Sequence, residues 1–326
     1  MRRQFLSHWL GAILFAAAVA PGAARAQGSY PDHAVRIIVP YTPGGFNDAM
    51  ARLFGKRLQE AFGQPFIVDN KPGGGTIVGT DLASKSPADG YTLLIQGFPL
   101  IVNQHLYAKL PYYSRNAFMP VILGGETPNV LLVRADSPFK TMKQLIDAAK
   151  AKPGQINYAS AGNGTSLHLA MEYFKSVTGT DMNHIPYKGS APMVNDLLCG
   201  QVDVMFDNLP NALPQVKAGK MRALAVSVPK RLSELPDIPT VAEQGYPGFD
   251  VTVWYGLFAP AGTPAAIVAK LNAELAKAMK TDAMKASFRA QGVEPIGGSV
   301  EDYQKFNRAQ DEKWGAVIRK SGIKAD

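Results

Sequence analysis

The stretch that decides the fold is AVRIIVPYTPGGFNDAMARLF, residues 34–54. Its first part, residues 34–41, is apolar, rich in β-branched residues and hardly alternating, which is typical of a buried parallel strand. A Pro-Gly-Gly turn follows directly, and the residues after it have the spacing of an amphipathic helix that Gly63 would end. Strand, glycine turn and helix are the beginning of a βαβ unit in an open parallel sheet.

The Pro43-Gly44-Gly45 turn would lie at the carboxyl edge of that sheet, where open α/β sheets bind ligands. Glycines allow close approach to the backbone, and the helix that follows offers amides and a positive dipole end. An anion suits such a turn, although a purely structural turn capped by Asn47 or Asp48 is an equal alternative. The chain lacks a P-loop and a complete dinucleotide fingerprint, so a carboxylate is favoured over a phosphate.

The same alternation continues through residues 65–98 and restarts at residues 141–226, with strands, glycine turns and helices in succession. Two long apolar, extended stretches, residues 120–138 and 249–264, separate these sets. We interpret them as crossovers to a second domain and back. The predicted organisation is therefore a first domain of residues 27–125 and 255–326, interrupted by a second domain of residues 126–254.

The second domain repeats the pattern in YASAGNGTSLH, residues 158–168, where a strand ends in glycines and a helix opens at Thr165 or Ser166. His168 falls in the first turn, where the positive helix end would lower its pKa, so a neutral donor and an exposed or cap-adjacent histidine are equal alternatives. Asp207 and Asn208 end another strand before Pro210 and are either ligand contacts or turn residues.

The first 26 residues are interpreted as a signal peptide, with Arg2 and Arg3 before a short apolar core and the site Ala24-Arg25-Ala26 before Gln27. The early arginine pair leaves the Sec and twin-arginine routes both open. The formal charge of +8 would become +5 without the three leader arginines, and no basic run with aromatics indicates nucleic-acid binding. Cys199, the one cysteine, is expected to be a buried structural thiol.

Enzyme chemistry finds little support in the sequence. The G-x-S-x-G elbow is absent, and so is any metal-ligand spacing among the four histidines that follow the leader. No catalytic residue, metal or cofactor is therefore predicted. An enzyme that acts on a small carboxylate in the same cleft remains the alternative from another class.

Five segments together carry a resemblance: residues 30–52, 68–94, 157–174, 185–210 and 222–264, which include VDNKPGGGTIVGTDLASKSPADGYTLL and IPYKGSAPMVNDLLCGQVDVMFDNLP. In this order they resemble the substrate-binding proteins of tripartite tricarboxylate transporters, the TctC or Bug family. The resemblance implies a type II-like periplasmic binding protein of two α/β domains, each an open, mainly parallel sheet flanked by helices. A monomer would close on a small organic anion and deliver it to a membrane permease. A separate alternative is a receptor that signals to a sensor kinase instead of, or as well as, a permease.

The ligand implied by the resemblance is a mono- or dicarboxylate, a class that includes aromatic acids and amino acids, held at loops of both domains. KPGGG and QGFPL depart from the common family pattern, and Phe98 would either face the cleft or pack in the core. The residues that the resemblance assigns to the site are Tyr41, Thr42, Pro43, Gly44, Gly45, Phe46, Asn47, Asp48, Gly73, Gly74, Gly97 and Phe98 in the first domain, and Ser160, Ala161, Gly162, Asn163, Gly164, Thr165, His168, Asp207 and Asn208 in the second.

Overall fold

The computed structural model describes residues 30–112, 116–290 and 292–324, so the predicted signal peptide and its cleavage site lie outside the described residues. The first βαβ units fold as predicted, with Val35–Val39 as a buried parallel strand and Gly63 as a left-handed helix end. The elements up to the first crossover are β1 (Val35–Val39), α1 (Phe46–Phe62), β2 (Phe66–Asn70), α2 (Ile77–Ser84), β3 (Thr92–Gly97) and α3 (Phe98–Leu106).

The strand β4 (Phe118–Arg134) begins two residues before the first apolar extended stretch and covers most of it, and the strand β9 (Thr252–Pro260) lies within the second. The elements between them are α4 (Met142–Ala151), β5 (Asn157–Ser160), α5 (Ser166–Thr178), β6 (Asn183–Pro186), α6 (Ser190–Cys199), β7 (Val204–Asn208), α7 (Leu209–Lys217) and β8 (Met221–Val226). After β9 come α8 (Ala265–Met279), α9 (Asp282–Arg289), β10 (Glu294–Gly297) and α10 (Val300–Ser321).

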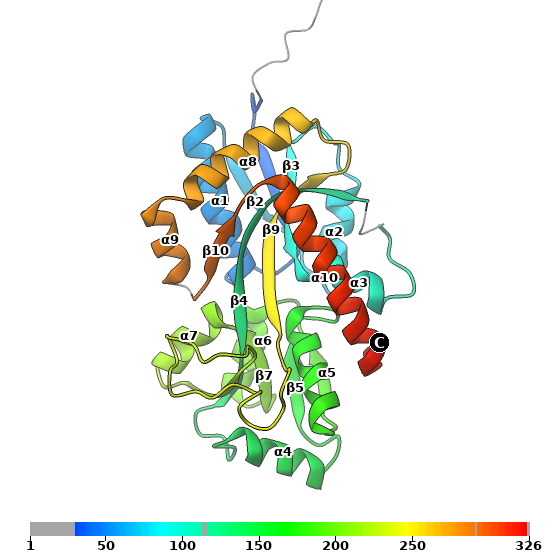
Figure 1. Ribbon diagram of the computed structural model, residues 1–326, viewed down its shortest axis with the longest axis vertical. Coiled ribbons are helices and arrows are strands. Elements are labelled where there is room, and N and C mark those ends of the chain that lie inside the picture. Colours follow the sequence, from blue (N-terminus) through cyan, green and yellow to red (C-terminus); the bar gives the residue numbers. More distant parts are fainter. Residues whose placement is uncertain (1–29, 113–115, 291, 325–326) are drawn as a thin grey trace, which may run out of the picture. The chain divides into compact units, whose positions relative to one another are not determined.

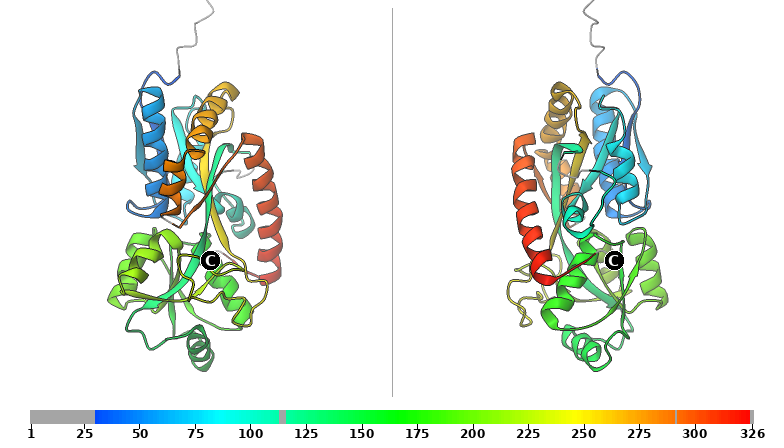
Figure 2. Two further views of the ribbon diagram at one scale, coloured as in Figure 1. Left: turned by 60° about the vertical axis from the view of Figure 1, so that its left-hand side comes forward. Right: turned by 90° about the vertical axis from the view of Figure 1, so that its right-hand side faces the viewer.

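The strands follow the order β2-β1-β3-β9-β4-β7-β5-β6, and β8 and β10 also pair with β4. The strands β1, β2 and β3 are parallel to one another, as are β5, β6 and β7. The long strands β4 and β9 add antiparallel pairs because each crosses from one set to the other; they run side by side in Figures 1 and 2. We call the elements around β1–β3 the first lobe and those around β5–β8 the second lobe.

Strand β4 changes partners between Pro128, which still pairs with β9, and Asn129, which pairs with β7. At this point the Asn129 amide donates to Ser227 Oγ, and the Asn129 side chain and Ser227 Oγ both donate to the carbonyl of Val251. The two crossovers are therefore tied together where the chain passes from one lobe to the other. The predicted domain boundaries at residues 125/126 and 254/255 lie near this point and stay a prediction.

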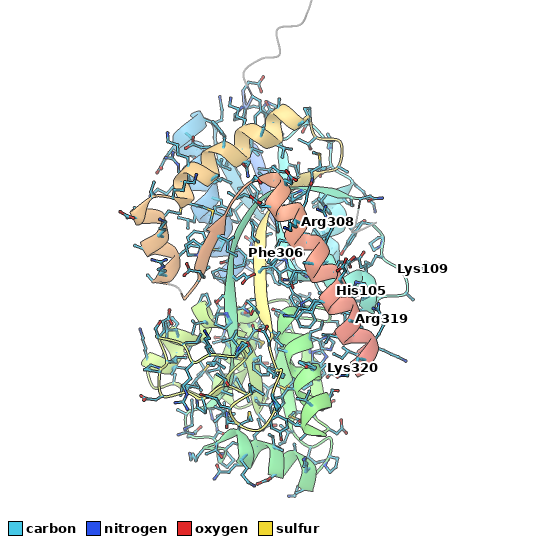
Figure 3. All side chains as sticks on the ribbon, viewed as in Figure 1. His105, Lys109, Phe306, Arg308, Arg319 and Lys320 are labelled. Atoms are coloured by element: carbon cyan, nitrogen blue, oxygen red, sulfur yellow. The ribbon has the colours of Figure 1, made fainter. Side chains whose placement is uncertain are left out.

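The C-terminal helices pack on the first lobe, with α8 against α1 and α10 against α3 and β4. In Figure 3, His105 of α3 lies beside α10, where its Nε2 is 2.6 Å from Asp311 Oδ1. The prediction of a buried Cys199 is wrong, because the residue is exposed at the end of α6. Met193 and Leu197 form the buried face of that helix, and a residue two positions after Leu197 falls on the opposite side.

Candidate functional site

The candidate site is a pocket where five helices begin. Its wall includes the first residues or caps of α1, α3, α5, α6 and α7, drawn from both lobes. Helix N-termini present amides without an intrahelical acceptor and the positive end of the dipole. The lining residues are Tyr41, Gly45, Phe46, Asn47, Gln96, Gly97, Pro99, Ala161, Thr165, Ser166, Leu167, Ser190, Asn208, Val253, Trp254 and Tyr255.

The start of α1 is organised by a buried carboxylate. Gly44 has the left-handed φ of 84°, and its amide donates to Asp48 Oδ2 at 3.1 Å. Arg52 and Asn70 also donate to Asp48. Burial by itself would raise the pKa of Asp48, but these hydrogen bonds outweigh it and lower the pKa. The expected cap by Asn47 or Asp48 is wrong: Gly45 is the N-cap, and Asp48 acts three residues later as an acceptor for the turn.

Gly45, Phe46 and Asn47 face the pocket, whereas Thr42, Pro43, Gly44 and Asp48 do not line it. The amides of Phe46 and Asn47 belong to the first helical turn, where helix geometry supplies no acceptor. The Thr42 amide instead donates to the carbonyl of Lys188 in the second lobe, at 3.3 Å. The amides of Phe46 and Asn47 are thus available to the pocket, whereas the Thr42 amide at the start of the turn binds the second lobe.

The junction between β3 and α3 contributes Gln96, Gly97 and Pro99 to the pocket. A Cβ at Gly97 would lie 2.1 Å from the Trp254 carbonyl oxygen, so β9 approaches too closely for any other residue. Phe98 is completely buried, with its ring 4.9 Å from Trp254 and 4.6 Å from Trp314. Of the two alternatives for Phe98, core packing is the one that the structure shows.

The second-lobe turn brings Ala161 and Thr165 to the pocket, together with Ser166 and Leu167 of α5. Thr165 is the N-cap, and its Oγ1 accepts from the His168 amide at 3.4 Å. Ser160, Gly162, Asn163 and Gly164 lie behind this wall and do not line it. Their role is to shape the turn: the Thr165 hydroxyl donates to the Gly162 carbonyl, and the Gly162 amide donates to Ser160 Oγ.

His168 is buried rather than exposed and does not line the pocket. It is adjacent to the cap, as one alternative had it, because its amide donates to the N-cap Thr165. Its Nδ1 accepts from the Gly164 amide at 3.3 Å, and its ring stacks on His184 at 4.5 Å. Burial lowers its pKa from the usual 6.5 to about 4, whereas the sequence had suggested the helix dipole as the cause. Within the structure, His168 holds the second-lobe turn in place.

Two residues at helix N-termini in the second lobe complete the polar wall. Ser190 opens α6, and Asn208 is the cap of α7. Asp207 lies behind them, fully buried, and its Oδ1 accepts from Ser190 Oγ at 3.0 Å, from the Asn208 amide at 2.8 Å and from Asn211 Nδ2 at 3.1 Å. Burial raises the pKa of Asp207 to about 6.

An aromatic wall from the crossover faces these polar groups, and sequence reasoning did not assign it to the site. Trp254 and Tyr255 are consecutive residues of β9, and the ring of Tyr255 meets that of Phe46 edge to face at 4.5 Å. The adjacent residues Trp254 and Tyr255 in the middle of the crossover were the available signal. Gln96, Pro99, Ser166, Leu167, Ser190 and Val253 also line the pocket without having been predicted.

The pocket has both polar and apolar walls but no charge: in the described part of the chain, no Asp, Glu, Lys, Arg or His lines it. Burial raises the pKa of Tyr41 and of Tyr255, so both phenols are neutral. Among the described residues no group of His, Cys, Asp and Glu could hold a metal ion. Any anion here would be held by helix amides, hydroxyls and amide side chains.

Gly73 and Gly74 do not line the pocket. Their neighbour Gly75 instead touches the second lobe, since a Cβ there would lie 1.9 Å from the Asn163 carbonyl oxygen. The cavity volume of the pocket is about 20 Å³. The two lobes therefore leave little room between them.

Comparisons with known proteins agree with this architecture. A family described as the tripartite tricarboxylate transporter family receptor matches residues 50–323. Protein BugT of Bordetella pertussis is 37% identical over 313 residues, 95% of this chain and 96% of BugT. The structure of R. palustris Rpa4515 with adipate is 38% identical, with a TM-score of 0.87, and covers 90% of this chain and 99% of that one.

MatC from Rhodopseudomonas palustris with bound malate is 30% identical, with a TM-score of 0.85 over 89% of this chain and 100% of MatC. In the described range, no helix is both long enough and apolar enough to cross a membrane. The match to the family runs through both lobes and through the strands that line the pocket. This chain therefore belongs to the tripartite tricarboxylate transporter family receptors, the TctC and Bug substrate-binding proteins of the periplasm.

Proposed function

We propose that the protein is a periplasmic receptor that captures a small organic acid between its lobes and delivers it to a tripartite membrane permease. The observation that carries the proposal is the convergence of five helix N-termini on one uncharged pocket. Amides fixed at helix ends stabilise an anion without the desolvation cost of burying a lysine or arginine beside it. A carboxylate fits the size and the neutral donors of such a site.

The donors fall into two groups, one at α1 and α3 of the first lobe and one at α5, α6 and α7 of the second. An acid with carboxylates at both ends would engage both groups, and adipate and malate in Rpa4515 and MatC are acids of this kind. The wall of Phe46, Trp254 and Tyr255 would contact the carbon chain between them. We therefore favour dicarboxylates as the first class to test.

Capture requires the lobes to part, because the present pocket is too small for an acid of several carbons. We propose that residues 27–125 with 255–326 move against residues 126–254 about the tie between Asn129, Ser227 and Val251. A ligand that contacts both lobes would stabilise the closed form, which the lobes would reach by a hinge motion. The predicted signal peptide of residues 1–26 would export the chain to the periplasm.

An enzymatic role is the competing proposal. Among the described residues, Ser160 and His184 form a pair that resembles a nucleophile and its base, with Oγ and Nε2 2.6 Å apart. Ser160 is completely buried and is not part of the pocket wall, and burial lowers the pKa of His184 to about 3. A nucleophile needs access to the substrate, and a base needs a pKa near the working pH. Ser160 lacks this access and His184 lacks this pKa, so the pair argues against hydrolysis here.

A thermal-shift screen tests the proposal with adipate, malate, monocarboxylates, aromatic acids and acidic amino acids. We expect at least one acid to raise Tm with 1:1 stoichiometry in calorimetry, and mass spectrometry to recover it unchanged after prolonged incubation. No binding across the screen would refute the receptor proposal. Conversion of the bound acid would support the enzyme instead.

A further inference from the structure

We propose that ligand capture by this protein takes up one proton at Asp207, and that Ser190 couples the Asp207 carboxyl to the pocket. The inference rests on the proposed function, because it concerns a carboxylate bound at the same pocket. It begins from a buried acid that the binding site described above does not itself use. Asp207 has no exposed surface, yet one hydrogen bond separates it from a pocket-lining hydroxyl.

The two carboxyl oxygens of Asp207 have very different surroundings. Oδ1 accepts three hydrogen bonds, from Ser190 Oγ, the Asn208 amide and Asn211 Nδ2. Oδ2 is buried and has no hydrogen-bond partner among the described residues. A buried oxygen without a donor is poorly stabilised as an anion, so Oδ2 is the atom that would carry the proton.

Ser190 has a single hydroxyl proton and stands between Asp207 and the pocket. While Asp207 is ionised, this proton is directed to Oδ1, and the Ser190 oxygen can present only lone pairs to the pocket. Lone pairs repel a carboxylate. When Oδ2 is protonated, Oδ1 becomes a weaker acceptor, and the Ser190 hydroxyl can turn to donate to the ligand. Protonation of Asp207 thus adds a donor to the site.

The charge of the ligand acts in the same direction, because a carboxylate in the pocket disfavours a second one behind Ser190. Burial already raises the pKa of Asp207 to about 6 without a ligand, and no charged side chain is among the causes of that shift. The proton therefore comes from solvent when the anion arrives. The acidic, basic and histidine residues on the elements packed against β7 are Glu126 and Arg134 on β4, His168, Glu172 and Lys175 on α5, Asp196 on α6 and Lys217 on α7. The remaining ionisable residues there are Tyr158 on β5, Tyr173 on α5 and Cys199 on α6.

Several of these residues are engaged elsewhere. Glu172 accepts from Lys175, and Asp196 accepts from Tyr187. His168 is neutral above pH 4, since burial lowers its pKa to about 4. A second cavity lies beside the site and is lined by Ser190 and Asn211, two of the groups that donate to Asp207, together with Gly44 and Pro214. Asp207 is thus the group near the pocket whose protonation would change most when an acid binds.

Calorimetry with adipate as the probe tests the proposal in buffers of different ionisation enthalpy near pH 7. The wild-type protein should take up close to one proton per adipate, and its affinity should be on the order of tenfold higher at pH 6 than at pH 8. Asp207→Asn should remove the uptake and leave only the pH dependence of adipate itself. Asp136→Asn is the matched control, because it changes an exposed acid far from Asp207 in the sequence, and it should behave as wild type.

Ser190→Ala tests how much of the effect comes from the Ser190 hydroxyl and how much from repulsion between the ligand and the Asp207 carboxylate. This variant should take up less than half as many protons per adipate as the wild type. Equal proton uptake in wild type and Asp207→Asn would overturn the proposal, and full uptake in Ser190→Ala would overturn the role of the hydroxyl. If adipate does not bind, malate and then the best acid of the screen take its place. Failure of every acid would refute the receptor proposal, and this inference with it, whereas binding without proton uptake would refute this inference alone.

Discussion

The Asp48 carboxylate and the Arg52 guanidinium form a two-point ion pair one helical turn apart, with Nε 3.0 Å from Oδ2 and Nη2 2.9 Å from Oδ1. Asp48 is 5% exposed, and the Arg52 side chain is 57% exposed. The same carboxylate accepts the Gly44 amide. The pair therefore links a surface arginine to the conformation of the turn that precedes the pocket.

Replacing Arg52 with alanine should destabilise the protein by about 1 kcal/mol, because a buried carboxylate loses its cation while solvent screens part of the loss. Affinity for the acid found in the screen should fall a few-fold through a looser turn. Lys56→Ala is the control, since Lys56 is 77% exposed and 4.0 Å from Glu60. Equal effects of the two changes in denaturant unfolding and calorimetry would show that Asp48 does not need its partner.

Gly45→Val should abolish or strongly weaken acid binding, because Gly45 lines the pocket and a branched side chain would fill the space before the α1 amides. The backbone at Gly45 is extended, so little strain is expected. Gly63→Ala is a useful comparison: its left-handed φ of 72° should cost about 1 kcal/mol of stability far from the pocket. A folded Gly45→Val protein with unchanged affinity would remove the turn from the binding site.

Gly75→Ala should hold the lobes apart and lower the affinity at least tenfold, because its Cβ would lie 1.9 Å from the Asn163 carbonyl oxygen. Gly74→Ala provides a closely matched control. Its φ of 55° resembles the 58° of Gly75, so the backbone strain is similar, but its Cβ would meet only Ile77 and Val78 at ordinary distances.

Small-angle scattering with saturating acid should show compaction for wild type and Gly74→Ala and a larger radius of gyration for Gly75→Ala. Calorimetry should give the same ranking. If both variants close and bind alike, the contact between Gly75 and Asn163 plays no part in closure.

The stacked pair of His168 and His184 should make the protein less stable in acid. Burial lowers both pKa values below the usual 6.5, that of His168 to about 4. Between pH 6.5 and 4 the unfolded chain therefore binds more protons than the folded one, and the free energy of unfolding falls as the pH falls. His168→Gln should flatten this slope, measured by urea unfolding at several pH values.

Asp207 contributes a slope of the opposite sign between pH 4 and 6, because its folded pKa is raised, so the comparison must be between variant and wild type. His33→Gln, at an exposed histidine, serves as the control. A slope in His168→Gln as steep as in wild type would mean that His168 is protonated in the folded protein.

Much of the fold could be predicted from local patterns. The apolar run of Val35–Val39, the glycine turn and the stop at Gly63 specify strand, turn and helix through steric and burial preferences that act over a few residues. The two crossovers also stood out as long apolar stretches between complete βα sets. What a local pattern could not give was their antiparallel pairing with each other, which depends on residues more than a hundred positions apart.

The site divides in the same way. The sequence by itself determined that glycine turns at Gly45 and Thr165 lead into helices, because the need for left-handed backbone and caps is local. Only the tertiary structure decided which neighbours face the pocket: it put Phe98 in the core, His168 behind the wall, and Trp254 and Tyr255 in the site. Those assignments depend on how β9 pairs with β3 on one side and with β4 on the other, and packing between distant strands sets that geometry rather than any residue's own preference.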